Sequence, residues 1–212
     1  MPIKIEGPFY IATGNPGKLR ELEAMVLEYF PSIKEIRGRA ARNAPEIEKT
    51  FIGNALIKAR ALTREISQEQ SELKQFAVLA DDSGLEVDAL KGEPGVRSAR
   101  YAGEKATPEA HMKKLLAALA PLNLPLEQRA GRYQCALALL IFDNGRIREW
   151  TSQGSCEGLI ADVPTGDSGF GYDPVFFSPR FGKTLSEVTY AEKNSISHRR
   201  EAFEGLKKQF LN

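Results

Sequence analysis

Two adjacent carboxylates, Asp81 and Asp82, follow directly after an apolar run and precede a serine and a glycine. The run, residues 76–80, has the length and composition of a fully buried strand. In open α/β sheets ligands collect where strands end, so acids placed there are candidates for binding or catalysis. Asp, Ser and Gly also form turns for purely local reasons, so a solvated turn over residues 81–84 is an equal interpretation. Both interpretations end the strand at residue 80.

Further polar groups that suit phosphate or metal chemistry lie near the start of a helix predicted over residues 50–68. Glu46 and Glu48 precede this helix, where carboxylates often only complement the helix dipole. A magnesium ion between substrate phosphates needs only one or two protein carboxylates, however, and water completes its coordination. Asn54 and Lys58, spaced i and i+4, lie on one face of the helix. Lys58 either orients a phosphate or a water molecule, or extends its ammonium group from a half-exposed face.

A glycine-containing segment over residues 13–18 joins a predicted strand over 9–12 to a predicted helix over 18–29. Backbone N–H groups and the positive end of a helix suit an anion there, and Lys18 adds a charge. The GxxxxGK[ST] spacing of a P-loop is absent, and Gly-Asn-Pro-Gly is also an ordinary turn. The candidate phosphate-binding residues are Thr13, Gly14, Asn15, Pro16, Gly17 and Lys18.

A second candidate group lies in the C-terminal third of the chain. Phe170 stands between two glycines, which let the backbone approach a flat ligand while the ring stacks on it. Aromatic residues beside glycines also serve simply as loop anchors. His198 and Arg199 fall in the first turn of a helix predicted over residues 195–210, where cations oppose the helix dipole. Such a placement favours a ligand or a buried partner carboxylate.

The elements that must position these groups predict an α/β fold. Strands expected over residues 85–90, 132–142, 146–154 and 175–177, a hairpin turn at 143–145 and a helix over 107–119 combine βα units with a long hairpin. This combination favours a mixed sheet, elongated or split into two lobes. Thr107 and Pro108 are expected to begin the helix as its N-cap and first residue.

Composition excludes several classes of function. The chain of 212 residues has a formal net charge of +1, so the overall balance does not favour binding of long nucleic acids. Two cysteines without metal-ligand spacing indicate a reducing compartment rather than a disulfide scaffold. Neither a signal peptide nor an apolar run long enough to span a membrane is found. We therefore expect a cytoplasmic protein without membrane association.

Taken together, the motifs resemble those of the inosine triphosphate pyrophosphatase family, also called the Ham1 or RdgB-like nucleoside triphosphate pyrophosphatases. The resemblance covers nearly the whole chain through TGNPGK, NALIKAR, ADDSGLEVDAL, PGVRSARYAG, GFGYDPVF and EKNSISHR. It implies an elongated two-lobed α/β fold with a long mixed sheet flanked by helices. Residues 1–212 would form one such domain, with the active site in the cleft between the lobes.

The resemblance also implies the reaction. A homodimer would hydrolyse ITP, dITP and XTP with Mg²⁺ to the nucleoside monophosphate and pyrophosphate, and would thereby clear deaminated purines from the nucleotide pool. By motif position, Asp82 would be the proton acceptor and a metal ligand, Lys58 would lie near the scissile linkage, and Ser83 would contact substrate. The 13–18 segment would hold phosphates. The purine and ribose would be bound by Phe170, Gly171, Tyr172, Asp173, Lys193, His198 and Arg199.

Three departures from the family pattern concern the site. The loop over residues 45–51 is shorter than usual, so the second metal ligand is either Glu46 or Glu48, and we prefer Glu46. Gly53 stands where many relatives carry an acid, and Cys156 where some carry a large aromatic residue.

Two alternative functions are considered. A Maf-like pyrophosphatase acting on dTTP or UTP is disfavoured by the His198-Arg199 pair and the Phe-Gly-Tyr-Asp segment. A catalytically weak nucleotide-binding module is compatible with the short glutamate loop.

Overall fold

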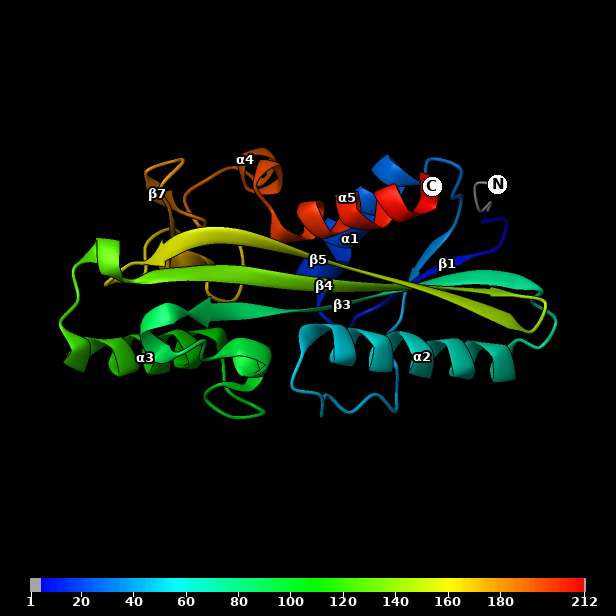
Figure 1. Ribbon diagram of the computed structural model, residues 1–212, viewed down its shortest axis with the longest axis horizontal. Coiled ribbons are helices and arrows are strands. Elements are labelled where there is room, and N and C mark those ends of the chain that lie inside the picture. Colours follow the sequence, from blue (N-terminus) through cyan, green and yellow to red (C-terminus); the bar gives the residue numbers. More distant parts are fainter. Residues whose placement is uncertain (1–4, 212) are drawn as a thin grey trace. The chain divides into compact units, whose positions relative to one another are not determined.

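The computed structural model describes residues 5–211, with side chains up to residue 209, and within this range seven strands form one sheet. The sheet order is β2-β1-β3-β4-β5-β6-β7 (Figure 1). Strand β1 is parallel to β2 and β3, whereas β6 is antiparallel to β5 and β7, so the sheet is mixed, as predicted. The strands are β1 (Phe9–Ala12), β2 (Ile36–Gly38), β3 (Gln75–Val87), β4 (Ala130–Asp143), β5 (Arg146–Ile160), β6 (Phe176–Ser178) and β7 (Lys183–Thr184).

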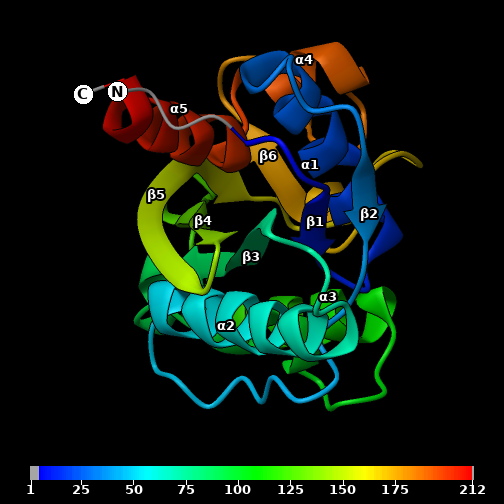
Figure 2. The same cartoon turned by 90° about the vertical axis from the view of Figure 1, so that its right-hand side faces the viewer.

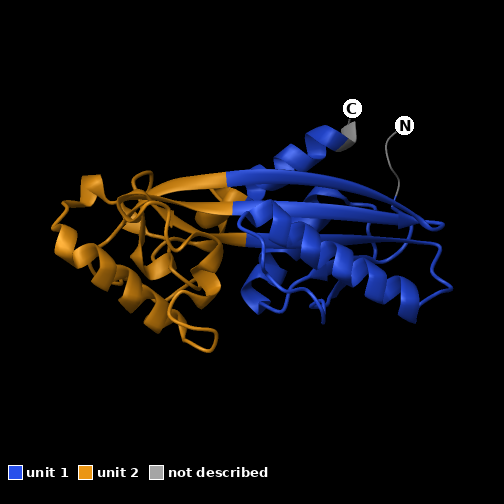
Figure 3. Ribbon diagram, turned by 60° about the horizontal axis from the view of Figure 1, so that its bottom comes forward, with its two compact units in different colours: residues 1–82, 135–154, 199–212 blue, residues 83–134, 155–198 orange. Residues whose placement is uncertain are grey.

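The chain divides into two compact units, shown in Figure 3. Unit 1 contains residues 1–82, 135–154 and 199–212, and unit 2 contains residues 83–134 and 155–198. Strands β3, β4 and β5 each contribute residues to both units. Each unit has a hydrophobic core of its own.

Unit 1 carries the helices α1 (Pro16–Tyr29), α2 (Phe51–Glu69) and most of α5 (His198–Leu211). Helix α2 covers one face of its part of the sheet, and α1 and α5 cover the other (Figures 1 and 2). The α1–α5 side is closed by buried apolar side chains of the helices and of β4, among them Leu22, Met25, Leu137, Phe203 and Leu206. Asn15 caps α1 by accepting hydrogen bonds from the backbone N–H groups of Gly17 and Lys18.

Unit 2 carries α3 (Pro108–Leu119), α4 (Tyr190–Ser195) and the 3₁₀ turns Asp88–Leu90, Gly95–Arg100, Ala120–Leu122, Leu126–Gln128 and Asp173–Val175. Thr107 caps α3 and Pro108 is its first residue, which confirms that prediction. The core joins Leu115 and Leu119 of α3 to buried residues of the sheet such as Leu85 and Phe176. Cys156 belongs to this core.

The prediction that a strand ends at residue 80 and that residues 81–84 form its exit loop is wrong. Strand β3 continues without interruption from Gln75 to Val87, and Asp81 and Asp82 are buried within it. The Asp-Asp-Ser-Gly sequence prefers turns only through local hydrogen bonding. Strand β1 pairs with β3 as far as Ala80, and β4 is the hydrogen-bonded neighbour of β3 on its other side. Strand pairing within the sheet therefore overrides the local turn preference of residues 81–84.

Two further boundaries differ from the predicted ones. The helix expected over residues 195–210 is divided into α4, which ends at Ser195, and α5, which begins at His198. A capping box of Thr189 and Glu192 starts α4 earlier than expected. Strand β5 extends beyond residue 154 to Ile160. Among the described residues, no helix combines the length and the apolar character that crossing a bilayer requires.

Candidate active site

Asp81 and Asp82 make contacts with helices on opposite faces of the sheet, because successive residues of a strand point to opposite sides. The Asp82 carboxylate lies 2.6 Å from the Lys58 Nζ atom and accepts a hydrogen bond of 3.2 Å from the side-chain amide of Asn54, and both partners belong to α2. The Asp81 carboxylate lies 2.5 Å from Lys18 Nζ of α1 and 3.2 Å from Arg199 Nε of α5. The two neighbouring acids therefore belong to different side-chain networks.

The Lys58 ammonium group joins three oxygen atoms. It lies 2.8 Å from Oε1 of Glu46 and donates to the backbone carbonyl of Asp81 at 3.0 Å, in addition to its bond to Asp82. Its side chain is only 15% exposed, so the interpretation of Lys58 as a half-exposed surface residue does not apply. Glu48, by contrast, is exposed and contacts Asn54 through its backbone. Of the two candidate glutamates, Glu46 is the one whose carboxylate shares a partner, Lys58, with the carboxylate of Asp82.

Burial and charge in this cluster shift the pKa values of both Asp82 and Lys58 upward. Burial raises the pKa of Asp82, and the opposing attraction of Lys58 does not cancel that effect. Burial lowers the pKa of Lys58, but the charges of Asp82 and Glu46 outweigh it, so the net pKa shift is upward. Lys58 therefore stays a cation, while Asp82 accepts a proton more readily than an exposed aspartate does.

Asp81 forms the buried centre of a second network. Burial raises the pKa of Asp81, but Lys18 and Arg199 together hold it well below its usual range. Arg199 is itself buried and lies 2.8 Å from Oε2 of Glu21, and the Cys135 thiol lies 3.2 Å from Asp81. Asp81 therefore keeps its charge to lower pH than an exposed aspartate does, and it fixes the ammonium group of Lys18 at the start of α1.

The 13–18 segment forms the junction of β1 and α1. The Asn15 side chain accepts from the N–H groups of Gly17 at 2.8 Å and Lys18 at 3.1 Å, and Thr13 Oγ1 accepts from the Asn15 N–H at 3.1 Å. These bonds give the segment a structural role as a helix cap. Residues 14–16 are exposed, and the Lys18 ammonium group is tied to Asp81. A phosphate-binding role for this segment stays a prediction.

Within unit 2, Asp173 connects the predicted base-binding residues. Its buried carboxylate lies 2.7 Å from Lys193 Nζ and accepts the Phe170 N–H at 2.9 Å and the Tyr133 hydroxyl at 3.2 Å. The Lys193 ammonium group also lies over the Phe170 ring, 4.5 Å from its centroid. One carboxylate thereby fixes both a cation and an aromatic side chain.

The His198 ring stacks on Tyr133, with ring centroids 5.0 Å apart and an interplanar angle of 13°. Tyr133 is therefore a member of this group that the sequence reasoning missed. It lies in the apolar strand β4, where an aromatic residue looks like ordinary core. Tyr172, in the predicted set, donates its hydroxyl to the backbone carbonyl of Ser98 at 2.9 Å. Gly171 has a φ of +66°, which favours glycine, and Ser83 follows Asp82 in β3.

Comparison with known proteins identifies the family. The model of the Ham1 family matches residues 9–209. This chain belongs to the Ham1 family. Among its relatives, the dITP/XTP pyrophosphatase of Geobacillus kaustophilus is 43% identical over 201 residues, which cover 94% of this chain and 92% of the relative. The enzyme of the same name from Shigella flexneri is 41% identical over 196 residues, 92% of this chain and 94% of its own length.

Solved structures of Ham1 proteins share the fold. The HAM1 protein of Coxiella burnetii has a TM-score of 0.75 and 35% identity, covering 96% of this chain and 98% of that one. The Ham1 protein of Staphylococcus aureus gives the same TM-score with 34% identity, over 96% of this chain and 97% of its own. The α/β fold with a mixed sheet, predicted from the motifs, is thereby confirmed.

The Ham1 family implies a divalent metal, and the donor groups of this chain fit one. Among the described residues, no cluster of three or more His, Cys, Asp or Glu side chains is arranged to hold a metal ion alone. Glu46 and Asp82 nevertheless direct oxygens at one ammonium group, so together they already surround a position for positive charge. Mg²⁺ bound with substrate phosphates needs only such a pair of carboxylates.

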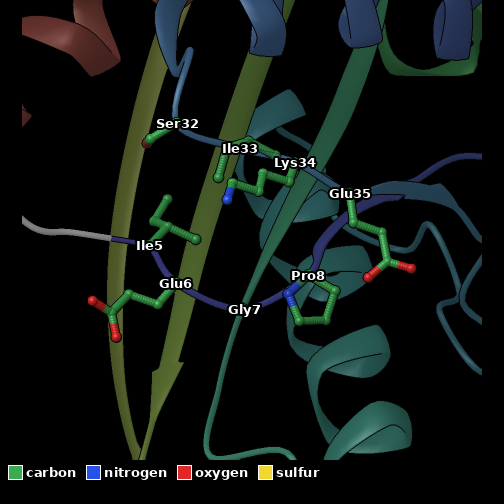
Figure 4. Close-up of a pocket in the computed structure, with 8 residues that line it drawn as sticks. All are labelled: Ile5, Glu6, Gly7, Pro8, Ser32, Ile33, Lys34 and Glu35. Carbon is green, nitrogen blue, oxygen red and sulfur yellow. The ribbon is translucent and has the colours of Figure 1, made fainter.

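One pocket of this Ham1 protein lies apart from every predicted site residue. Figure 4 shows that it is lined by residues that precede β1 and residues that follow α1. These residues are Ile5, Glu6, Gly7, Pro8, Ser32, Ile33, Lys34 and Glu35. The Lys58 cluster, by contrast, is formed by the loop before α2, by α2 and by β3.

Proposed function

We propose that this Ham1 family protein hydrolyses non-standard purine nucleoside triphosphates, namely ITP, dITP and XTP, to the nucleoside monophosphate and pyrophosphate. The observation that carries the proposal is the joint binding of Glu46 and Asp82 by Lys58. Two carboxylates beside a buried cation supply a proton acceptor, metal ligands and a positive charge for phosphate oxygens. The names of the relatives, dITP/XTP pyrophosphatases, support the same reaction. Removal of these nucleotides clears deaminated purines from the pool.

In this proposal, water attacks the triphosphate and the anhydride bond between the α- and β-phosphates breaks. Asp82 accepts the proton that the water loses, and its raised pKa suits that role. Lys58 orients the water or the phosphate and stabilises the charge that develops on oxygen. Pyrophosphate leaves, and the monophosphate is released from the same site.

We further propose that Mg²⁺ is bound by Glu46 and Asp82 together with the phosphates of the substrate. When bound there, Mg²⁺ neutralises charge on the phosphate oxygens. Residues 13–18 hold the phosphates at the positive end of α1, where Lys18 adds a charge, and Ser83 contacts the substrate. The support is the helix N-terminus that this segment forms, and the ion pair that fixes Lys18.

The purine and ribose are proposed to bind in unit 2. Phe170 offers an aromatic face, and Lys193 and His198 lie in the same Asp173–Tyr133 group. Lys193 carries only donors, so an acceptor such as a 6-oxo group suits it and a 6-amino group does not. A buried polar group left unpaired costs about 1–3 kcal/mol, which is enough to discriminate between the two. The triphosphate is proposed to bind to groups of unit 1.

Arg199 was predicted to bind the purine and ribose. Its partners Glu21 and Asp81 belong to unit 1, whereas the Asp173–Tyr133 group belongs to unit 2. We propose that Arg199 acts on the substrate mainly by holding Asp81, and through Asp81 the phosphate-binding Lys18. The lowered pKa of Asp81, which Lys18 and Arg199 cause, supports this indirect role.

A panel of triphosphates with Mg²⁺ tests the function. We expect pyrophosphate and monophosphate from ITP, dITP and XTP at rates at least about tenfold above those from ATP and GTP, corresponding to roughly 1.4 kcal/mol of discrimination. Equal rates on ATP and GTP contradict the proposed specificity. Fastest turnover of dTTP or UTP supports the Maf-like alternative, and binding without turnover supports the nucleotide-binding module.

We also propose that the protein acts as a homodimer in the cytoplasm, which rests on its resemblance to the family. Light scattering during gel filtration measures the mass. A mass near twice the 23.4 kDa of the chain supports the dimer, and a mass equal to that of one chain contradicts it.

A further inference from the structure

Asn54 connects the loop that carries Glu46 to the strand that carries Asp82. The side chain of Asn54 is fully buried near the start of α2. Its Oδ1 accepts the Glu48 N–H at 3.0 Å, while its Nδ2 donates to the Glu48 carbonyl at 3.3 Å and to Asp82 Oδ2 at 3.2 Å. Both amide hydrogens and the amide oxygen are thus used, and they fix the backbone of the loop on one side and Asp82 on the other.

The residue before Asn54 leaves room for the same loop. A Cβ atom at Gly53 would lie 2.7 Å from both Cβ and Cγ of Glu48, closer than real Cβ contacts allow, and 3.0 Å from Oγ1 of Thr50. Gly53 lies in regular helix, so its missing side chain is not required by its backbone conformation. The close approach of Glu48 is what requires glycine at this position.

The segment before α2 passes along the side of α2 that faces away from the sheet, as Figures 1 and 2 show. Local hydrogen bonds hold it at both ends of the Glu46–Glu48 stretch. The Ile47 N–H donates to the carbonyl of Pro45 at 3.0 Å, and Asn54 holds both backbone groups of Glu48. Glu46, between these two points, is directed at Lys58.

We propose that Gly53 and Asn54 form a seat for the loop of residues 45–48 and thereby position Glu46 beside Asp82 and Lys58. The proposal rests on the proposed function, in which Glu46 and Asp82 bind Mg²⁺. In this proposal Gly53 and Asn54 act through Glu46 and Asp82, so both are positioning residues. Their contribution is to join two carboxylates, 36 positions apart in the chain, into one site.

The Asn54→Ala variant removes all three side-chain bonds of the seat. Two properties are measured: hydrogen exchange of the Glu48 amide in the metal-free protein, and binding of Mn²⁺ in the presence of the non-hydrolysable analogue α,β-imido-dITP. We expect the Glu48 amide to exchange at least about tenfold faster, because its acceptor is lost. The dissociation constant for Mn²⁺ should rise at least about tenfold, as for other groups that orient metal ligands.

Thr63→Val is the matched control for this variant. Thr63 is also buried in α2, and its hydroxyl donates to the Ala59 carbonyl at 2.8 Å, within the helix. The control therefore also removes a buried polar group from α2 but does not touch the loop. Glu48 exchange and Mn²⁺ affinity should stay within about twofold of the wild type. Unchanged exchange or unchanged affinity in a folded Asn54→Ala variant overturns the proposal.

Gly53→Ala tests the seat without deleting a hydrogen bond. Alanine favours a helix over glycine, so the melting temperature should not fall on account of the helix itself. The added Cβ atom displaces Glu48, so Mn²⁺ affinity should fall at least about fivefold. The double variant Gly53→Ala, Glu48→Gly lacks the Cβ and Cγ atoms of residue 48 that the new alanine would meet. It should therefore recover most of the Mn²⁺ affinity. A merely structural role predicts the reverse, with lower stability and unchanged affinity.

The experiments separate failure of the seat from failure of the proposed function. A wild-type protein that neither hydrolyses dITP nor binds Mn²⁺ with the analogue contradicts the proposed function. The exchange of the Glu48 amide, measured without metal, still decides whether Asn54 fixes the loop. A functional wild type with variants of unchanged metal affinity contradicts the seat alone.

Discussion

The Nζ atom of Lys58 lies 2.6 Å from Asp82 Oδ1, and the same atom lies 2.8 Å from Glu46 Oε1. One ammonium group therefore links a carboxylate of β3 to a carboxylate of the loop before α2. Because Lys58 is mostly buried, these interactions are less screened by solvent than those of surface ion pairs. The arrangement brings two acids and a cation together.

Replacement of the proposed proton acceptor should abolish turnover without unfolding the protein. In Asp82→Asn the amide has nearly the same shape but cannot accept the proton, so kcat for dITP should fall at least about 100-fold. Asp88→Asn is the control, because Asp88 forms an ion pair with Arg132 near the surface. Pyrophosphate release and circular dichroism measure the two properties. Near-normal activity of a folded Asp82→Asn variant shows that another group accepts the proton.

Substitution of each candidate glutamate identifies the second metal ligand. Glu46→Gln should raise the Mg²⁺ concentration for half-maximal activity at least about tenfold, because one charged ligand is lost. Glu48→Gln, two residues away with an exposed side chain, should keep the wild-type value. Magnesium titrations of dITP hydrolysis give both constants. If Glu48→Gln instead raises this Mg²⁺ concentration and Glu46→Gln does not, Glu48 is the second metal ligand.

Loss of the Lys193 charge should weaken both binding and selection of the base. Lys193→Met leaves the buried Asp173 carboxylate without its cation. We expect KM for dITP to rise about tenfold or more, with a smaller change in kcat, and the preference for dITP over dATP to decrease. Lys183→Met, at an exposed position of the same unit, serves as control. Unchanged KM and preference would falsify the assignment of Lys193 to the base.

Two neighbouring arginines should differ sharply in their effect on stability. Arg199→Met leaves the buried carboxylates of Glu21 and Asp81 without their shared cation, and breaking such a buried pair costs about 3–5 kcal/mol. Arg200 pairs with Glu28 at the surface, so Arg200→Met should cost no more than about 1 kcal/mol. Urea denaturation gives both free energies of unfolding. Similar losses in the free energy of unfolding for the two variants would contradict a special role of the buried Arg199 ion pairs.

Tyr29 should make the stability of the protein depend on alkaline pH. Burial and a 2.6 Å hydrogen bond to Glu204 raise the pKa of Tyr29 to about 12. In the unfolded chain its pKa is about 10. Its stabilising contribution is therefore complete below pH 10 and is lost as the pH rises towards 12, because only the unfolded chain releases the proton in that interval.

Tyr29→Phe measures this contribution. The variant should lose less stability than the wild type between pH 10 and pH 12, and its tyrosinate absorbance should lack one late-titrating group. Equal loss of stability in the two proteins over this range means that Tyr29 titrates normally.

Local patterns in the sequence predicted those features that depend on neighbours along the chain. The helical spacing of apolar residues located α1 and α2 to within about two residues, and Asn54 and Lys58, four positions apart, both contact Asp82 as expected for one helix face. The position of Asp81 and Asp82 inside β3 could not be predicted in this way. It depends on pairing with β1 and β4, which are distant in sequence.

The other features that the sequence did not predict depend on contacts between distant segments of the chain. The cationic residues at the start of the last helix indicated either a ligand or a buried acid, and for Arg199 the structure provides two acids, Glu21 and Asp81. Tyr133 was missed because its relation to His198 and Asp173 depends on side chains 40 or more positions away. No local pattern reports such a contact.

Because β3 runs without interruption through both aspartates, insertions and deletions within this strand should disrupt the site. Because successive side chains of a strand alternate between the faces of a sheet, an insertion or deletion of one residue between β1-paired Ala77 and Asp81 would exchange the two aspartates between α2 and the α1–α5 side. Each acid would then meet the partners of the other. Natural variants of this chain should therefore change length in the turn at residues 70–74, before β3, and conserve the number of residues from there to Asp82.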